Sequence, residues 1–570
     1  MKHCPVCQRK YSDETLNFCL EDGEWLLNVP SGSEATTAIL EPGKVPIEAS
    51  ARQQIRATDE TAILPGGAVD EKRISGTPID RKMLRAAGIV LFLVGAGVLG
   101  YRYFGPSPYE QINSIAVLPF ENESGNSDIE YLSDGMTESM INSLSRLPSL
   151  SVKARSSVFR YKGKGAEPTA VGKDLNVQAV LNGRVIQRGG EVTISLELVN
   201  VGTGDHIWGD QYNRKLGDLA ALQSEIALDV SQNLRLRLTG EQSQVVNKNQ
   251  TQNSEAYQEY LQGRYHWNKR TIDSNRKAIE YFQRAMEKDP SYALAYVGLA
   301  ECYVTGFLSH RERKPKVEAA ARKALEIDPT LGEPHAVLGM MRTSDFQYAE
   351  AENEFLRAIE LSPNYATAYH WYAESLAMQG RFDESFARYN NALELDPLSL
   401  AIGTDLGRTY YLARQYDRAI EHLEKLIETD KNYARTHFYL STAYQEKGLF
   451  EKSVEEVGAG LVLNGEQPER IEMGKRAVLE AYKASGPRGY WKAILEIQQE
   501  DLRNRVYISP VTIAIAHARL GERDEAFAWL EKMFDEGGGA YAALKVSPEW
   551  DNLRDDSRFR DVLRRAGFND

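Results

Sequence analysis

Hydrophobic positions in the second half of the chain follow a helical period. Across residues 254–570, apolar residues recur every three or four positions, in segments separated by turn signals. Asp-Pro or Ser-Pro pairs mark four of these turns, at Pro290, Pro329, Pro363 and Pro397, and the last two intervals are 34 residues long. Because proline cannot continue the interior of a helix, each pair ends a helical segment. The pattern predicts an all-helical, repetitive region over 254–570.

The 34-residue period and the residues within it resemble the tetratricopeptide repeat. Leu338 and Gly339 stand where that family places its Leu-Gly pair, and Ala358 and Pro363 fall on its second-helix signature. The resemblance implies an all-α solenoid of helical hairpins, whose first helices line a concave groove. A late unit near residues 513–530 and a capping helix over 547–568 complete the expected array.

The second, fifth and ninth residues of each repeat face that groove in the family. We expect the contacts with a partner protein or peptide to come from His370, Glu374, Thr404, Arg408, Arg435, Phe438 and Thr442. The lysine and asparagine with which some family members grip a peptide carboxylate do not occur at these positions. The basic, acidic and apolar side chains found there instead fit an extended or helical peptide with apolar and acidic groups.

Residues 112–240 alternate between strand and helix signals. Apolar runs predict strands at 114–120, 150–154, 179–188, 192–200 and 207–212, and helices at 129–147 and 216–238. Gly189-Gly190 lies between two alternating runs and predicts a tight hairpin. Elements of these lengths predict a compact α+β domain.

The same region resembles the TolB amino-terminal or FlgO-like domain. The resemblance rests on SIAVLPFEN, YLSDGMTESMINSL and VLNGRVIQRGGEVTISLELVNVGTGDHIWGDQY, within residues 113–238. It implies a non-catalytic binding module, of a kind often fused ahead of tetratricopeptide repeats in bacterial membrane proteins and regulators. The polar residues Asp134, Asn182, Arg184 and Trp208 fit either a ligand site or ordinary turn, surface and core positions.

One apolar segment, residues 82–104, predicts a transmembrane helix. Residues 86–101 carry no charge, and snorkelling of Arg85 and Arg102 lets 84–104 reach the thickness of a bilayer. A buried helix of a soluble protein is the alternative. Small residues within the segment leave a homodimer of such helices open.

The orientation of that helix follows from its flanking charges. Basic residues gather before the segment, at Lys72, Arg73, Arg81 and Lys82, and are sparse after it. The positive-inside rule places the N-terminus in the cytoplasm. We therefore expect a single-pass protein of the inner membrane, with residues 105–570 outside the cytoplasm.

The chain begins with cysteines at the spacing of metal ligands. Cys4, Cys7 and Cys19 resemble three quarters of a zinc ribbon, and Asp22 takes the place of the fourth cysteine. Three thiolates and one carboxylate can complete a structural zinc site, so residues 1–27 predict a zinc-ribbon-like head. A metal-free remnant is the alternative. Residues 28–81 lack hydrophobic periodicity and predict a disordered linker.

Composition narrows the classes of function. The 68 basic and 81 acidic residues give a net charge of −13, so nucleic acid is not an expected general partner. The nine histidines form no HExxH motif, and Gly163-Lys164-Gly165 lacks the spacing of a P-loop. We therefore expect a protein that is not an enzyme.

Two functions fit this multidomain arrangement. The first is a membrane-anchored scaffold whose repeats gather proteins in the bacterial cell envelope. The second is a transmembrane signalling protein, in which binding outside changes the state of the cytoplasmic zinc-binding head.

Overall fold

The computed structural model describes residues 2–3, 10–11, 27–28, 112–234, 236, 251–269, 272–305, 310–504, 506–537 and 543–568. The chain divides into two units, Met1–Val29 with Gln111–Asp570 and Pro30–Glu110. The predicted membrane helix, the predicted zinc ligands and the predicted linker beyond Asn28 lie outside the described residues. Within the parts that are described, no helix combines the length and the apolar character needed to cross a bilayer.

Three short strands are described near the N-terminus. They are β1 (Lys2–His3), β2 (Lys10–Tyr11) and β3 (Leu27–Asn28), and β1 pairs antiparallel with both of the others. Cys4 and Cys7 fall in the segment between β1 and β2, and Cys19 and Asp22 fall between β2 and β3. The pairing therefore holds the ends of both segments that carry predicted ligands at one small sheet.

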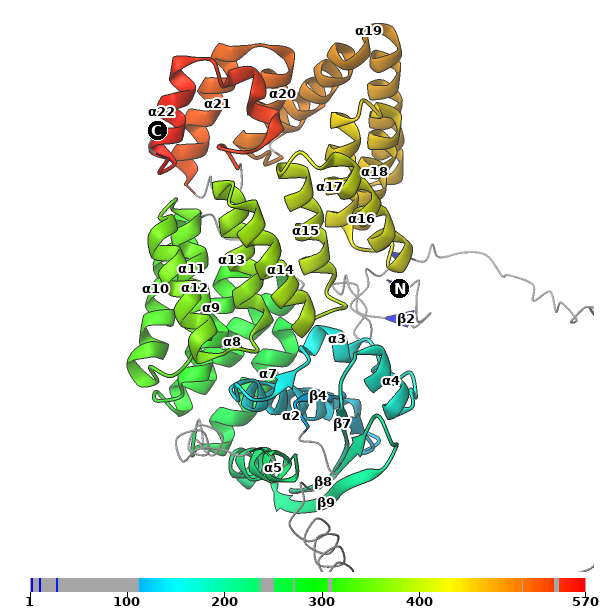
Figure 1. The fold of residues 1–570 in the computed structure, drawn as a ribbon, viewed down its shortest axis with the longest axis vertical. Coiled ribbons are helices and arrows are strands. Elements are labelled where there is room, and N and C mark those ends of the chain that lie inside the picture. Colours follow the sequence, from blue (N-terminus) through cyan, green and yellow to red (C-terminus); the bar gives the residue numbers. More distant parts are fainter. Residues whose placement is uncertain are drawn as a thin grey trace, which may run out of the picture. The chain divides into compact units, whose positions relative to one another are not determined.

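A mixed sheet forms the centre of the domain over residues 112–236 (Figure 1). Its strands are β4 (Ser114–Val117), β5 (Glu121–Asn122), β6 (Ser151–Val152), β7 (Ala179–Arg188), β8 (Glu191–Asn200) and β9 (His206–Lys215). The order is β6-β4-β7-β8-β9, with β5 beside β7. β4 pairs in parallel with β6 and β7, whereas β7, β8 and β9 form an antiparallel meander.

This is a small α/β domain with an antiparallel extension, where the sequence predicted α+β. The sequence predicted a strand at 150–154, where β6 lies, but it did not indicate that β4 pairs in parallel with β6 and β7. The hairpin at Gly189-Gly190 is confirmed: Arg188 pairs with Glu191, and Gly189 adopts a φ of 61°. Such a two-residue turn needs positive φ, which glycine adopts at little cost.

Two of the helices in this domain were predicted and two were not. The predicted ones are α2 (Glu130–Ser145) and α5 (Leu219–Asn233), each slightly shorter than expected. The others, α3 (Arg155–Phe159) and α4 (Pro168–Asp174), have five and seven residues. Helices of one or two turns are too short to show a clear hydrophobic periodicity, so the sequence pattern did not predict them.

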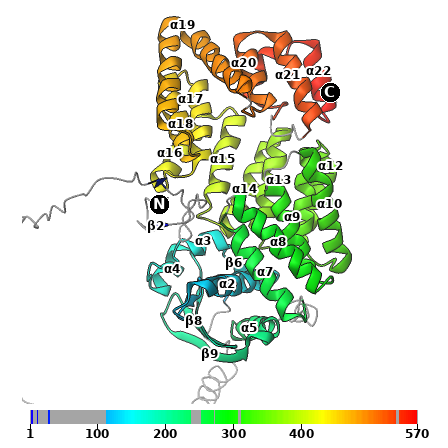
Figure 2. The same ribbon diagram turned by 180° about the vertical axis from the view of Figure 1, so that it is seen from behind.

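Helical hairpins follow the α/β domain (Figures 1 and 2). They are α7 (Ser254–Trp267) with α8 (Ile272–Lys288), α9 (Ala293–Thr305) with α10 (His310–Ile327), α11 (Glu333–Ser344) with α12 (Tyr348–Leu361), α13 (Ala366–Gln379) with α14 (Phe382–Leu395), α15 (Leu400–Leu412) with α16 (Tyr416–Thr429), and α17 (Ala434–Glu446) with α18 (Phe450–Leu463). Glycines let the paired helices approach closely: a Cβ at Gly339 would lie 2.8 Å from the Phe355 ring. The predicted tetratricopeptide architecture is confirmed.

The regular period ends after α18. The next element, α19 (Pro468–Arg503), has 36 residues and is broken by non-helical backbone at Ser485 and Gly486. It forms one hairpin that is longer than the 34-residue repeat. Four elements complete the array: α20 (Pro510–Leu520), α21 (Arg523–Glu536), the short η4 (Pro548–Leu553) and α22 (Ser557–Arg565). The last two replace the single capping helix predicted over 547–568.

The C-terminal elements fold back onto the turns of earlier hairpins. Arg414, in the turn between α15 and α16, forms an ion pair with Asp551 of η4 at 2.6 Å. The ring centroids of Phe346 and Phe534 lie 5.9 Å apart, and those of Tyr348 and Phe568 lie 5.2 Å apart. These contacts connect the end of the chain to hairpins that lie more than 130 residues earlier.

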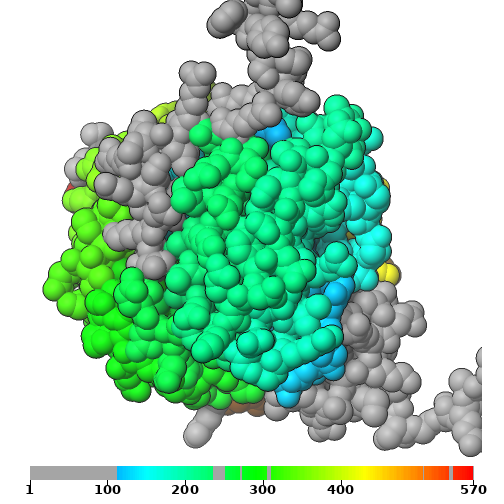
Figure 3. Space-filling view, turned by 90° about the horizontal axis from the view of Figure 1, so that it is seen from below, coloured from blue at the N-terminus to red at the C-terminus, as the bar shows by residue number. Residues whose placement is uncertain are grey.

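The α/β domain is joined to the repeats through backbone and side-chain bonds. In the view from below, the surface of this domain passes directly into the green surface of the first repeats (Figure 3). The Asn364 amide, just before α13, donates to the carbonyl oxygens of Ser145, Leu147 and Leu150 at 3.1, 3.2 and 2.7 Å. Farther along, the Asp396 carboxylate accepts hydrogen bonds from the hydroxyls of Ser156 and Ser157.

A buried ion cluster lies within the same joint. The Arg264 guanidinium of α7 contacts Glu138 of α2 and Glu301 of α9, and all three side chains are nearly excluded from water. The Tyr365 hydroxyl donates to Glu301 at 3.2 Å. Two folded regions that are separate in sequence therefore share one set of buried charges.

We expect Asn364→Ala to lower the free energy of unfolding by about 2 kcal/mol, because three carbonyl oxygens lose their donor in a buried joint. Asn432 occupies the same repeat position two units later, away from α2. The matched variant Asn432→Ala should change the free energy by less than about 0.5 kcal/mol. Urea denaturation of both variants measures the difference. Equal losses of unfolding free energy in the two variants would mean that the hydrogen bonds of Asn364 to the α/β domain add no stability.

Candidate functional site

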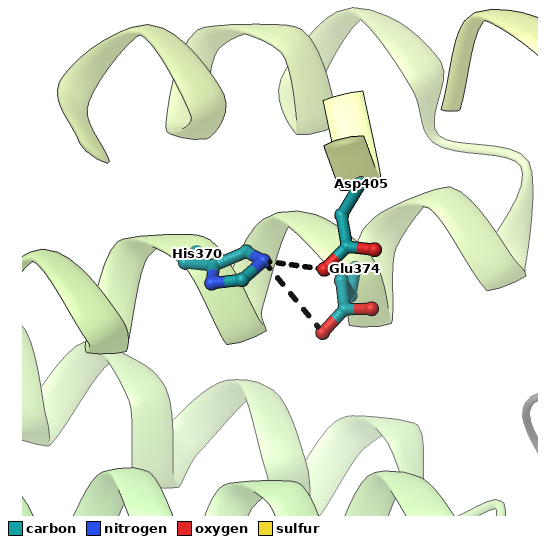
Figure 4. Close-up of side chains that lie close together, drawn as sticks. All are labelled: His370, Glu374 and Asp405. Atoms are coloured by element: carbon teal, nitrogen blue, oxygen red, sulfur yellow. Dashed lines mark hydrogen bonds and ion pairs between the residues drawn. The ribbon is translucent and has the colours of Figure 1, made fainter. Parts of the chain in front are cut away.

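The candidate site lies on the first helices of three successive hairpins, α13, α15 and α17. These are the helices that line the groove of a tetratricopeptide array. His370 and Glu374 are four residues apart on α13 and so share one face of that helix. Asp405 approaches from α15 (Figure 4), and Arg435 from α17. The four residues form what we call the groove cluster.

Ion pairs connect the members of the groove cluster. His370 Nε2 lies 2.9 Å from Asp405 Oδ2 and 4.0 Å from Glu374 Oε2. The Arg435 guanidinium lies 2.8 Å from Asp405 Oδ1 and 3.8 Å from Glu374 Oε1. The carboxylates are buried, with Asp405 1% and Glu374 5% exposed, whereas the Arg435 side chain is 40% exposed. Arg435 is therefore the member of the cluster that meets solvent.

Burial and neighbouring charges set the protonation of the cluster. Burial raises the pKa of Glu374, and the negative charge of Asp405 raises it further. Burial also disfavours the charged form of Asp405, but Arg435 and His370 outweigh it, so the pKa of Asp405 is lowered. For His370, burial disfavours the imidazolium, yet the hydrogen bond to Asp405 and the two carboxylates raise its pKa overall. Asp405 is thus the stable anion around which the cations gather.

The same residues could in principle hold a metal ion. His370, Glu374 and Asp405 each offer one ligand atom, and these atoms lie within 4.8 Å of one another. However, the positively charged Arg435 already forms an ion pair with the Asp405 carboxylate. Two unit charges about 4 Å apart interact by roughly 4 kcal/mol at a partly buried site, and a divalent ion doubles that repulsion. The arrangement therefore favours an ion-pair network over a metal centre.

Most of the predicted groove residues lie in or beside this cluster, but they differ in what they do. His370, Glu374 and Arg435 are members of it. The positive charge of Arg408 lies close enough to favour the charged forms of Glu374 and Asp405. The Thr404 hydroxyl lies 2.7 Å from that of Thr436 and is buried. Its bond joins α15 to α17 and leaves little for a partner to contact.

Phe438 and Thr442 lie apart from the cluster. The Phe438 ring packs toward α18, where a Cβ at Gly460 would lie 2.7 Å from it. The Thr442 hydroxyl donates to the backbone carbonyl of Tyr439 at 2.8 Å. The Phe438 ring therefore supports helix packing, the Thr442 hydroxyl is satisfied within its own helix, and the polar chemistry of the groove comes from α13, α15 and the start of α17.

Sequence reasoning missed Asp405 and Tyr439. Asp405 anchors the cluster, and the Tyr439 hydroxyl accepts a hydrogen bond from Arg435 Nε at 3.1 Å. Both are the sixth residue of their unit, whereas the prediction used the second, fifth and ninth. The sixth residue follows the second by four positions and so lies on the same face of the helix, and a groove rule that includes it would have found both.

Comparisons with known families agree with the two folded regions. Residues 110–227 match the family described as the HilA/YgeH-like transcriptional regulator, second domain. The sequence had suggested a TolB amino-terminal or FlgO-like domain for this region. Residues 354–387 and 376–437 match tetratricopeptide repeat families. The chain therefore carries tetratricopeptide repeats behind a HilA-like domain.

Among curated proteins, a Rhizobium meliloti (strain 1021) protein described as a candidate adenylate cyclase is 30% identical over 245 residues, 42% of each chain. The transcriptional regulator HilA of Salmonella typhimurium is 25% identical over 315 residues, 54% of this chain and 55% of HilA. The chain thus matches about half, or less, of the length of these relatives.

Among solved structures, the type IV pilus biogenesis factor PilW aligns with 38% of this chain and 97% of its own, at 21% identity and a TM-score of 0.32. YrrB, a tetratricopeptide protein with an unusual peptide-binding site, aligns with 33% of this chain and 95% of its own, at 18% identity and a TM-score of 0.24.

The raised pKa of His370 predicts a pH-dependent stability. Its folded-state pKa lies above that of the unfolded chain, so the stabilisation is complete below about pH 6.5 and is lost as the pH rises through the folded-state value. His370→Gln should therefore cost about 2 kcal/mol at pH 5.5 and clearly less at pH 9 in urea denaturation. In an Asp405→Asn background, where only Glu374 still favours the imidazolium, the cost should vary less with pH. A cost that is equal at both pH values in the unmodified background would contradict the assignment.

Proposed function

We propose that this chain is a non-enzymatic, membrane-anchored scaffold whose repeat groove binds a protein segment that carries an acidic group. The observation that supports it is the partly exposed Arg435 at the start of α17, held by Asp405 and Tyr439. A guanidinium held in place loses little entropy when it binds a carboxylate, and it can do so with two parallel hydrogen bonds.

The charge of the groove supports an acidic partner. His370, Arg408 and Arg435 supply three positive charges when His370 is protonated, against two carboxylates, Glu374 and Asp405. The excess positive charge is nearest to solvent at Arg435. A partner carboxylate there would complete the balance, which is the general basis of complementarity at charged interfaces.

Sequence features supply the remaining parts of the proposal. The apolar segment 84–104 would anchor the protein in the inner membrane, with the N-terminus in the cytoplasm and residues 105–570 outside. Cys4, Cys7, Cys19 and Asp22 would hold a structural zinc ion in the head. Strand β1, directly before Cys4, pairs with β2 and with β3.

A second candidate is a transmembrane signalling protein that couples binding by the outer region to the zinc-binding head. Its support is the similarity to HilA, a transcriptional regulator, and to a candidate adenylate cyclase. In this alternative the α/β domain and the repeats would form the sensing part. Occupancy of the groove would then change what the head contacts.

A photo-crosslinking amino acid at Thr367, a partly exposed groove position on α13, tests the groove in intact cells. We expect a defined crosslinked partner that Arg435→Glu removes, because the fixed guanidinium is replaced by a repelling carboxylate. The matched charge reversal Arg418→Glu, on the second helix α16, should leave the crosslink intact. The same probe at Lys425 on α16 should give no such product. Loss of the crosslink in both arginine variants would overturn the groove assignment.

Cysteine labelling tests the topology. Cys302 is buried, so the informative reporter is an introduced cysteine at an exposed site such as Lys425→Cys, in a Cys302→Ala background. In intact spheroplasts, a membrane-impermeant maleimide should label this cysteine without detergent. Labelling that appears only after lysis would reverse the orientation. A protein that alkaline carbonate extracts from membranes would refute the anchor.

Elemental analysis tests the head. The full-length protein should contain about one zinc per chain, because three thiolates and a carboxylate fill a tetrahedral site. Cys7→Ser should lose most of the metal. Asp22→Cys, which restores four thiolates, should retain it more tightly against a chelator. Zinc that persists unchanged in Cys7→Ser would place it elsewhere.

A further inference from the structure

A large cleft lies in the α/β domain, away from the repeat groove. Its volume is about 940 Å³, within the range of small-molecule sites. The loop after β4, residues 118–123, and the loop before α4, residues 161–168, line it together with part of the β7–β8 sheet surface. Asn182 and Arg184, two of the polar residues singled out in the sequence, belong to this lining.

The cleft lies at a particular place in the sheet topology. From β4 the chain passes through α2 to β6 on one side, and then returns through α3 and α4 to β7 on the other side of β4. Such a reversal separates the connections that leave the carboxyl ends of neighbouring parallel strands, and it opens a crevice there. The segment that follows β4 and the segment between α3 and α4 line the cleft. The topology therefore places it where open α/β sheets bind ligands.

The charges that line the cleft select the kind of ligand. Five carboxylates face it against two cations, Lys162 and Arg184; the carboxylates are those of Glu121, Glu123, Glu130, Glu167 and Glu197. Both cations are engaged already, since Lys162 pairs with Glu130 and Asp134, and Arg184 with Glu123. A cleft with an excess of one sign of charge concentrates ligands of the opposite sign.

The shape and the walls narrow the ligand further. Among the described residues, these carboxylates do not converge closely enough to hold one metal ion. They are spread over two loops, two strands and the start of α2, so a complementary ligand carries several positive charges along its length. The rings of Phe120, Tyr161 and Tyr265 add apolar and aromatic surface, against which alkyl chains and ammonium groups both bind well.

We propose that this cleft binds an aliphatic polyamine. The ammonium groups pair with several carboxylates of the lining, among them Glu121 on β5 and Glu197 on β8, and the methylene chain lies against the aromatic rings. The site is independent of the groove cluster, and its ligand is a small cation where the groove takes an acidic protein segment.

Calorimetric titration of the full-length protein in detergent with spermidine, at 150 mM salt, tests the proposal. We expect saturable binding that Glu121→Gln with Glu197→Gln weakens at least tenfold. The matched control pair is Glu191→Gln with Asp205→Asn, which removes the same charge from exposed positions of the same domain outside the cleft. The control pair and Arg435→Ala should change the affinity by less than twofold.

Three outcomes would overturn the proposal. The first is the absence of saturable heat up to millimolar spermidine. The second is equal weakening by the cleft pair and the control pair, which would indicate only diffuse attraction to an acidic protein. The third is tighter binding of citrate than of spermidine, which would reverse the sign of the ligand. Circular dichroism of each variant confirms that a weakened affinity does not reflect unfolding.

Discussion

The folded part of this chain depends on the burial of Arg264. Its guanidinium lies between Glu138 of the α/β domain and Glu301 of the second hairpin, where water satisfies almost none of the three charges. Removing one member of such a buried set costs about 3–5 kcal/mol, because the others stay charged and unpaired. A buried ion pair of this kind adds little stability compared with apolar side chains packed in the same place, but its charges are satisfied in only one arrangement of the helices. The cluster therefore fixes how α2 lies against the first repeats.

Carboxylates have opposite uses at the two candidate sites. In the groove, Asp405 is buried and forms ion pairs with His370 and Arg435, so it holds these two cations in place. In the cleft of the α/β domain, Glu121 and Glu197 are exposed, so their carboxylates are accessible to a ligand. Burial decides the difference, because a buried carboxylate must find its partner within the protein. One chain can therefore offer an arginine to an acidic partner and carboxylates to a cationic one.

The sequence predicted those parts of the fold whose signal is local and repeated. Prolines at a fixed interval and a helical period predicted the helical hairpins, and Gly189-Gly190 predicted the turn between β7 and β8. The parallel pairing of β4 with β6 and β7 was missed because it depends on how the chain crosses over between these strands, which no local pattern encodes. Asp405 was missed for another reason: its role depends on Arg435, thirty residues later, and on the angle between α15 and α17. No local pattern encodes that meeting, whereas His370 and Glu374 share one helix and could be paired by spacing alone.

The contacts at both ends of the array limit its length. Hairpins of a solenoid contact only their neighbours, so an open array can gain or lose whole units with little effect on the rest. Here α2 covers the outer side of α7, where Gly135 lies against Leu261, and the C-terminal η4 returns to Arg414. One additional unit between α8 and α13 would move Asn364 away from the carbonyl oxygens that it contacts in the α/β domain, and one between α16 and η4 would move Asp551 away from Arg414. The number of repeats is therefore part of the fold, and homologues that keep both contacts should differ in their loops and not in their repeat count.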